Sequence, residues 1–239
     1  MSALASERTE KRATQFLRAA REIFLTEGWD HFSVESIADF AECSRPLVYR
    51  HFSCKEEILL ALAIESKRRR VRLCERALAF LGRPRERMLA IGEVEGLLLP
   101  RDLPIELFVA STNLRAKTSR QRQEELKVMD VRSVSMSASV IREAVNVRDL
   151  TLPDGIGAED LLFFMWASRW GAANIMRSDT PLRHAGVTQA AKSVELSLSL
   201  MMDGFGWRPL SAEWDYKDTR KRVHRDAFSA EVVGKILNE

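Results

Sequence analysis

The side chains with the clearest potential for chemistry crowd into one stretch, SRPLVYRHFSCKEE. Arg45 is its second residue, and an arginine can donate two parallel hydrogen bonds to a guanine. Leu47 or Val48 can contact a thymine methyl group, because that methyl is apolar. Tyr49, His51 and Lys55 carry donor groups of the kind that bind phosphate oxygens. These types and this spacing predict a surface that contacts the backbone and reads the bases of double-stranded DNA.

Two short helices with a tight turn between them would position these side chains. Ser33 is a candidate N-cap for a helix in VESIADFAE, whose apolar residues recur at helical spacing. Ser44 is a candidate N-cap for a second helix over 45–52. Pro46 fits its first turn, where N–H groups have no partner within the helix. This arrangement matches a helix-turn-helix, in which the second helix enters the major groove and the first braces it.

Helical periodicity continues along the chain, with no strand alternation or internal repeat, so we predict an all-α fold. The first helix should end at Gly28, which suits a left-handed C-terminal stop. Further helices are predicted over 10–27, 54–81, 86–99, 105–117, 121–148, 158–177 and 186–204, with one or two helical stretches after Gly206.

Composition bounds the remaining possibilities. The 239 residues are 46% hydrophobic and carry a net charge of only +3, so charge that binds DNA must be local. No apolar run is long enough to span a membrane, LLFFMW at 161–166 included, and the N-terminus lacks an apolar signal core. Three cysteines without a CxxC pair indicate reduced thiols and a cytoplasmic protein. The four histidines lack metal-ligand spacing, so no metal or cofactor is expected.

The chain also lacks the common catalytic motifs. Neither G-x-x-x-x-G-K-[ST] nor H-E-x-x-H nor G-x-S-x-G occurs in the sequence. We therefore expect that the protein is not an enzyme and has no catalytic residues.

Residues 10–60 resemble the DNA-binding domain of the TetR family of bacterial transcriptional regulators. The resemblance rests on Gly28, Ser33, Val34-x-x-Ile37-Ala38, Val48-Tyr49-Arg50-His51-Phe52 and Lys55-x-x-Ile58. It implies that Phe52 belongs to the core. With the reasoning above, it gives a candidate DNA-binding set of Ser33, Ser44, Arg45, Pro46, Leu47, Tyr49, Arg50, His51 and Lys55.

Two positions depart from the family pattern. Glu42 occupies the turn where the family usually has glycine, so it must adopt the turn at some energetic cost. Leu47 replaces a residue that could form hydrogen bonds, which changes the bases that can be read. The basic run KRRRVR, residues 67–72, is interpreted as a solvated helix face, because its charges spread around the helix.

The resemblance implies a helix-turn-helix domain over 1–53 and a ligand-binding and dimerisation domain over 54–239, with 54–81 as connecting helix. The family builds its dimer from two helices per subunit, and 158–177 and 186–204 are the candidates. Helix 158–177 is apolar on two faces, which predicts burial on both sides. Aromatic and methionine side chains suit a small, largely hydrophobic effector. The candidate pocket residues are Phe108, Asn113, Met136, Phe163, Trp166 and Trp170.

These observations favour a ligand-responsive transcriptional regulator, a repressor that binds a near-palindromic DNA operator as a homodimer. An alternative is a DNA-binding protein of the same fold with a non-transcriptional role, such as a nucleoid or division factor. The number and position of its genomic binding sites would distinguish the two.

Overall fold

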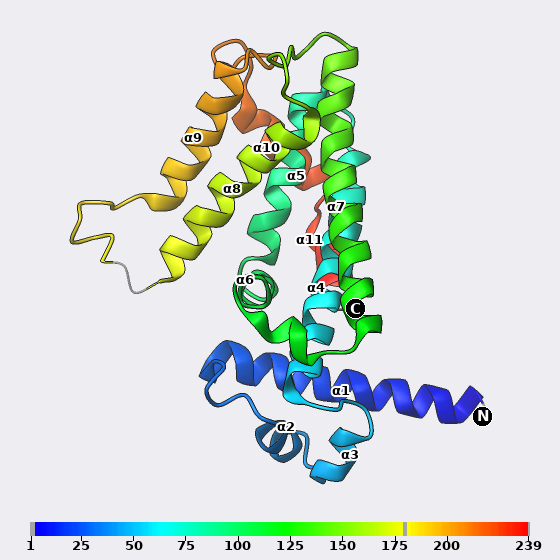
Figure 1. Cartoon of the computed structure of the whole chain (residues 1–239). Coiled ribbons are helices and arrows are strands. Elements are labelled where there is room, and N and C mark those ends of the chain that lie inside the picture. The colour runs from blue at the N-terminus through cyan, green and yellow to red at the C-terminus, as the bar shows by residue number, and fades with distance from the viewer. Residues whose placement is uncertain (1–2, 179–180, 239) are drawn as a thin grey trace. The chain divides into compact units, whose positions relative to one another are not determined.

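The computed structural model describes residues 3–178 and 181–238, and within these ranges the predicted all-α fold is confirmed: helices alone form the regular structure (Figure 1). No helix among these residues is long and apolar enough to cross a bilayer. The elements in order are α1 (Ala3–Glu27), α2 (Val34–Phe40), α3 (Arg45–Tyr49), α4 (Lys55–Leu78), α5 (Pro84–Leu98), α6 (Leu103–Ser111), the 3₁₀-helix η1 (Asn113–Lys117), α7 (Arg120–Asn146), α8 (Ala158–Arg177), α9 (Ala190–Gly204), α10 (Tyr216–Asp226) and α11 (Ala230–Asn238).

Several predicted helices differ from the observed ones, and the first, predicted over 10–27, already begins at Ala3. Helix α3 ends at Tyr49 rather than near residue 52, and the chain continues in a turn. The helix predicted over 105–117 is observed as two elements, α6 and η1. They are separated at Thr112, whose backbone is extended and whose hydroxyl donates a hydrogen bond to Phe108 O. Helix α9 begins at Ala190 rather than 186: Gly186 has a left-handed backbone with φ of 82°, and residues 187–189 are not helical.

The chain divides into two compact units, and the first combines residues up to Arg70 with Gly96–Asp130. Its apolar core joins α1, α2, α3 and the start of α4 to residues from α6 onward. The Phe108 ring of α6 meets Phe24 edge-on and also lies against Trp29, with ring centroids 5.3 and 5.2 Å apart. Other members of this core include Phe16, Ile37, Val48, Phe52, Ile58, Ile105 and Val109.

The first unit also buries paired charges. Arg69 of α4 donates two hydrogen bonds to the Asp102 carboxylate, at 2.8 and 2.7 Å, and both residues are buried. Arg70 donates to Glu106 of α6 at 2.9 Å. The interpretation of the basic run as a solvated face was therefore wrong for Arg69 and Arg70. Acidic partners some 35 positions away in sequence neutralise them, which a local charge pattern cannot indicate.

Glu106 is the most perturbed acid in this cluster. Burial alone would raise the pKa of its carboxyl. The charges of Arg70 and Lys67 and the Ser66 hydroxyl outweigh burial and lower the pKa to about 2. Glu106 therefore stays ionised inside the core, and its charge ties α6 to α4.

The second unit combines Val71–Glu95 with Val131–Glu239. In it α8 and α9 lie side by side (Figure 1). The stretch after α9 packs on α5: the buried Arg85 guanidinium pairs with Asp203 at 2.6 Å and donates to Pro209 O at 2.9 Å. Helix α10 is held to α5 by Arg220 and Glu93, 2.8 Å apart. Core residues of this unit include Met88, Ile141, Leu161, Met165, Leu198 and Trp207.

Candidate nucleic-acid interface

Helix α2 begins as the sequence predicts. The Ser33 hydroxyl accepts a hydrogen bond from Ser36 N at 3.0 Å, and the Ser36 hydroxyl accepts from Ser33 N at 3.1 Å. This reciprocal capping box satisfies two N–H groups that lack partners within the helix. The N-cap prediction for Ser33 is confirmed, while its contact with DNA stays a prediction.

The turn between α2 and α3 contains the predicted strain. Glu42 has φ of 50°, the left-handed region that favours glycine. Hydrogen bonds from Glu42 N to Asp39 O and from Cys43 N to Ala38 O, 3.1 and 2.9 Å, close the turn around it. Such a conformation costs a residue with a Cβ about 1 kcal/mol. The carboxylate of Glu42 is exposed.

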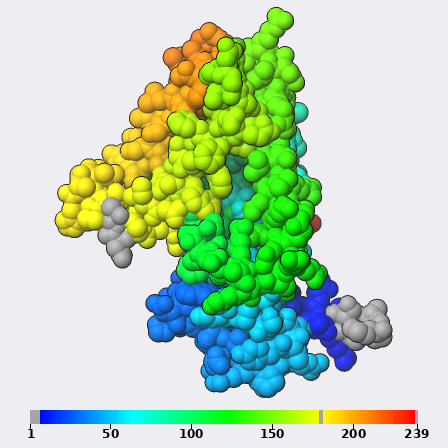
Figure 2. Space-filling model, in the orientation of Figure 1, coloured from blue at the N-terminus to red at the C-terminus, as the bar shows by residue number. Residues whose placement is uncertain are grey.

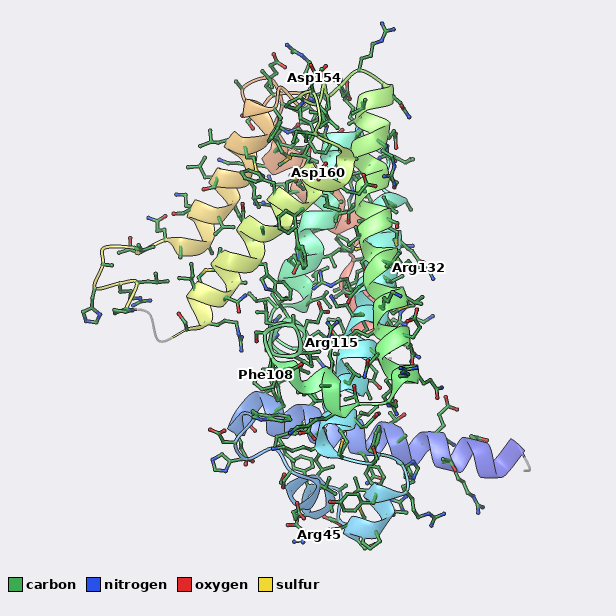
Figure 3. All side chains as sticks on the ribbon, viewed as in Figure 1. Arg45, Phe108, Arg115, Arg132, Asp154 and Asp160 are labelled. Carbon is green, nitrogen blue, oxygen red and sulfur yellow. The ribbon has the colours of Figure 1, made fainter. Side chains whose placement is uncertain are left out.

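Helix α3 presents a polar outer face over an apolar inner one. Pro46 lies in its first turn, as predicted, and Ser44 precedes it without a side-chain capping bond. Val48 points inward and has no exposed surface. Arg45, Pro46, Tyr49 and Arg50 are exposed. Figure 3 shows Arg45 on the outer side of the helix pair, away from α1.

The other three candidates have intramolecular contacts. Leu47 is half-buried and packs against the core. The His51 ring meets Phe16 edge-on at 5.3 Å, and its pKa is lowered by burial and by the nearby Arg50 and Arg12. The Lys55 ammonium lies 4.1 Å from the centroid of the Trp29 ring, a cation–π geometry. These contacts determine the positions of the three side chains in the absence of DNA. A DNA contact by any of them stays a prediction.

Sequence reasoning missed one charged residue on this surface. Glu35, in the first turn of α2, forms an ion pair with Arg45, with Oε1 and Nη1 3.2 Å apart. Ten positions separate the two residues, so helical spacing could not relate them. Only the turn geometry brings them together.

The six candidate pocket residues fall into two groups. On α8, Phe163, Trp166 and Trp170 form a row of aromatic rings, with successive centroids 6.5 and 5.4 Å apart. Phe108 belongs to the core of the first unit, and Asn113 is exposed on η1 of the same unit. Met136 is half-buried on α7 in the second unit. A shared ligand pocket stays a prediction.

The outer face of α8 and α9 is apolar and open to solvent in the single chain. Leu161 and Met165 of α8 and Leu198 of α9 face the core. The predicted burial of α8 on both sides is therefore not observed within one chain. Figure 2 shows the surface of these two helices in yellow-green to orange. Its exposed apolar residues include Phe163, Phe164, Trp166, Ile175, Leu196 and Leu200.

The described cysteines are free thiols. Among the described residues, no group of three or more histidine, cysteine or acidic side chains could hold a metal ion. Cys43 and Cys54 are half-buried thiols, and Cys54 Sγ lies 3.6 Å from Lys117 O.

The fold and this surface define a class: an all-α protein with an N-terminal helix-turn-helix and a second, helical unit. Residues 16–62 match the family model described as bacterial regulatory proteins, tetR family. This is the segment, and the family, that the sequence resemblance indicated.

Curated relatives match the same segment. The transcriptional activator FasR of Mycolicibacterium smegmatis is 42% identical over 53 residues, which cover 22% of this chain and 24% of that protein. The transcriptional regulator TcmR of Streptomyces glaucescens is 37% identical over 57 residues, or 24% and 25% of the two chains. The chain thus spans about a quarter of the length of these relatives.

Solved structures extend the likeness in fold to most of the chain. The TetR-family regulator PfmR of Thermus thermophilus has a TM-score of 0.61 and 18% identity over 79% of this chain and 97% of its own. A gamma-butyrolactone receptor, described as ArpA-like, has a TM-score of 0.60 and 17% identity over 91% and 98%. At such identities the likeness concerns the fold alone.

Proposed function

We propose that this protein is a transcriptional regulator that binds double-stranded DNA through α3. The observation that carries the proposal is the face of α3. Arg45, Tyr49 and Arg50 project outward, and Val48 anchors the helix from inside. A helix this short fits within one major groove, and an arginine at its start can reach a guanine edge. The tetR-family match over 16–62 supports the same role.

The acting form in this proposal is a homodimer joined through α8 and α9. Phe163 of α8 is 64% exposed, and Leu196 and Leu200 of α9 are each 59% exposed. Contiguous exposed apolar side chains of this size mark a surface that another protein covers. A two-fold dimer would place two copies of α3 on half-sites about 34–36 Å apart, one turn of B-DNA.

The proposed regulation is by a small, largely hydrophobic effector that contacts the Trp170 end of the aromatic row on α8. Trp170 is half-buried, offers a large apolar face, and has an indole N–H that can orient a polar atom of the ligand. The likeness in fold to a gamma-butyrolactone receptor, a protein named for a small molecule, supports this part of the proposal. An effector would act by binding one DNA-binding state more tightly than the other.

The test is a selection from a library of random double-stranded DNA with the purified full-length protein. We expect enrichment of inverted repeats whose half-site centres lie about 10 base pairs apart. Binding to the selected duplex should weaken steeply with salt, because phosphate contacts release counterions. Recovery of no common sequence would contradict the proposal.

Within the proposal, the protein represses its target promoter, because a dimer bound across the promoter would exclude RNA polymerase. The curated relatives include an activator, FasR, and a repressor in Mycobacteroides abscessus that is 35% identical over 54 residues. A reporter under a promoter that contains the selected sequence decides the sign. Repression predicts higher reporter output when the chain's gene is deleted, and lower output would indicate activation.

A further inference from the structure

The ion pair between Glu35 and Arg45 joins the two helices of the helix-turn-helix on their outer side. Glu35 Oε1 and Arg45 Nη1 are 3.2 Å apart, and the side chains are 42% and 59% exposed. Exposed ion pairs contribute little to stability, and α2 and α3 are already held together by buried apolar residues. A structural role for Glu35 exists, since an acid in the first turn suits the helix dipole. That role does not require contact with Arg45.

The pair limits what the Arg45 guanidinium can do. Without a partner, a long exposed arginine samples many rotamers, and fixing one of them against a base costs entropy. The carboxylate occupies the Nη1 end of the guanidinium and leaves donors on Nε and Nη2 for another acceptor. Two parallel donors from one arginine are what guanine O6 and N7 accept.

The same carboxylate has a cost on a surface that meets DNA. A negative charge beside the phosphate backbone weakens binding to every sequence equally. Glu35 would therefore lower the affinity for every DNA sequence. At the same time it would raise the ratio of the affinity for the selected sequence to the affinity for random DNA. A merely structural role would not produce these two opposite effects, so measuring both distinguishes a positioning role from a structural one.

We propose that Glu35 is a positioning residue for base recognition: its carboxylate orients Arg45 for a guanine and reduces binding to random sequence. The inference rests on the proposed function, because it assumes that α3 contacts DNA. It assigns Glu35 an indirect role, through Arg45, in choosing the sequence that is bound.

The experiment compares sequence selection by the wild-type protein and by Glu35→Ala, Glu35→Gln, Arg45→Ala and the Glu35→Ala/Arg45→Ala double variant. We expect Glu35→Ala to lose base preference at the same base pairs as Arg45→Ala, with the ratio of selected to random DNA affinity falling about tenfold. Affinity for random duplex should rise about twofold. The double variant should discriminate no worse than Arg45→Ala, and Glu35→Gln should lie between wild type and Glu35→Ala.

Asp39→Asn provides the matched control, because Asp39 is an exposed acid on the same helix. It should raise binding to random duplex without changing any base preference. Thermal midpoints of all variants should stay close to wild type, since the pair is exposed.

Three results would overturn the inference. Unchanged base preference in Glu35→Ala would show that the pair does not orient Arg45. Loss of preference at a different base pair would mean that Glu35 reads a base directly, for instance a cytosine amino group. If the wild-type protein selects no sequence at all, the proposed function fails as well, and that outcome is visible before any variant is compared.

Discussion

The two compact units of this chain differ in what they bury and what they expose. The first unit buries salt bridges, such as that between Arg69 and Asp102, and presents arginine and tyrosine on the outer face of α3. The second exposes phenylalanine, tryptophan and leucine along α8 and α9. A charged outer face suits a polyanion, and an apolar one suits another protein surface. The exposed chemistry of each unit therefore indicates a different class of partner.

The largest effect is expected from breaking the buried pairing in the first unit. Glu106→Gln removes the buried carboxylate that pairs with Arg70 and Lys67, which should lower the free energy of unfolding by about 3–5 kcal/mol. Urea unfolding measures the loss. Glu125→Gln is the control, because Glu125 pairs with the exposed Arg68 and should change stability by about 1 kcal/mol or less. Equal losses in both variants would contradict the importance of burial.

The same pair predicts the acid response. The pKa of Glu106 is lowered from an ordinary 4.5 to about 2, so the unfolded chain binds more protons than the folded one between these values. Its contribution, on the order of 3 kcal/mol, is present above about pH 4.5 and is lost as pH falls toward 2. Stability of Glu106→Gln should depend less on pH across this window, and parallel pH curves would argue against the assignment.

The apolar face of the second unit provides the next test. Replacing Leu196 and Leu200 by aspartate puts charge on the proposed dimer surface without disturbing the core. We expect monomers in sedimentation velocity and roughly hundredfold weaker binding to the selected duplex, because two linked half-sites are lost. Leu81→Asp is the control, since Leu81 is 90% exposed and lies outside α8 and α9. A dimer that survives both aspartates would place the partner surface elsewhere.

The charged face of α3 should respond in a different way. Arg45→Ala should cost about 1–3 kcal/mol of discrimination at the base pair it reads, measured by competition between the selected duplex and single-base variants. Arg50→Ala sharpens the contrast, because loss of a phosphate contact should weaken all sequences alike and reduce the salt slope by about one. Uniform weakening by Arg45→Ala would remove its base-reading role.

The smallest effect concerns the turn. Glu42→Gly relieves the left-handed backbone strain and should raise the free energy of unfolding by about 0.5–1 kcal/mol. Chemical unfolding with Glu42→Ala as comparison separates conformation from charge, because alanine removes the carboxylate but keeps the Cβ. Stabilisation by alanine equal to that by glycine would point to charge instead.

The sequence predicted the features that local rules govern. The Ser33 cap and the Pro46 helix start follow from neighbouring residues, whereas the strained Glu42 and the buried Phe52 came from the family resemblance, and the structure confirms each. Contacts between distant segments were not predictable from one sequence. Arg69 finds Asp102, and Glu35 finds Arg45, only after the helices have packed.

The candidate pocket residues also show that a single sequence does not predict the surroundings of a side chain. Phe108 and Trp166 share a residue type that suits a ligand, but the fold gives them different surroundings. Phe108 completes the core of the first unit, and Trp166 lies on the exposed face of α8. Aromatic composition alone does not say which helix face a ring occupies.

The contribution of α6 to the first core bears on how such modules are exchanged between proteins. The segment that matches the family model ends at residue 62, but Ile105, Val109 and Phe108 of α6 pack into the core that this segment builds. A chimaera that joins residues 1–62 to the C-terminal part of another protein would lack that packing. The first unit is therefore discontinuous along the chain. A fusion protein that is meant to keep the DNA specificity of this unit has to contain residues 96–130 as well as the N-terminal segment.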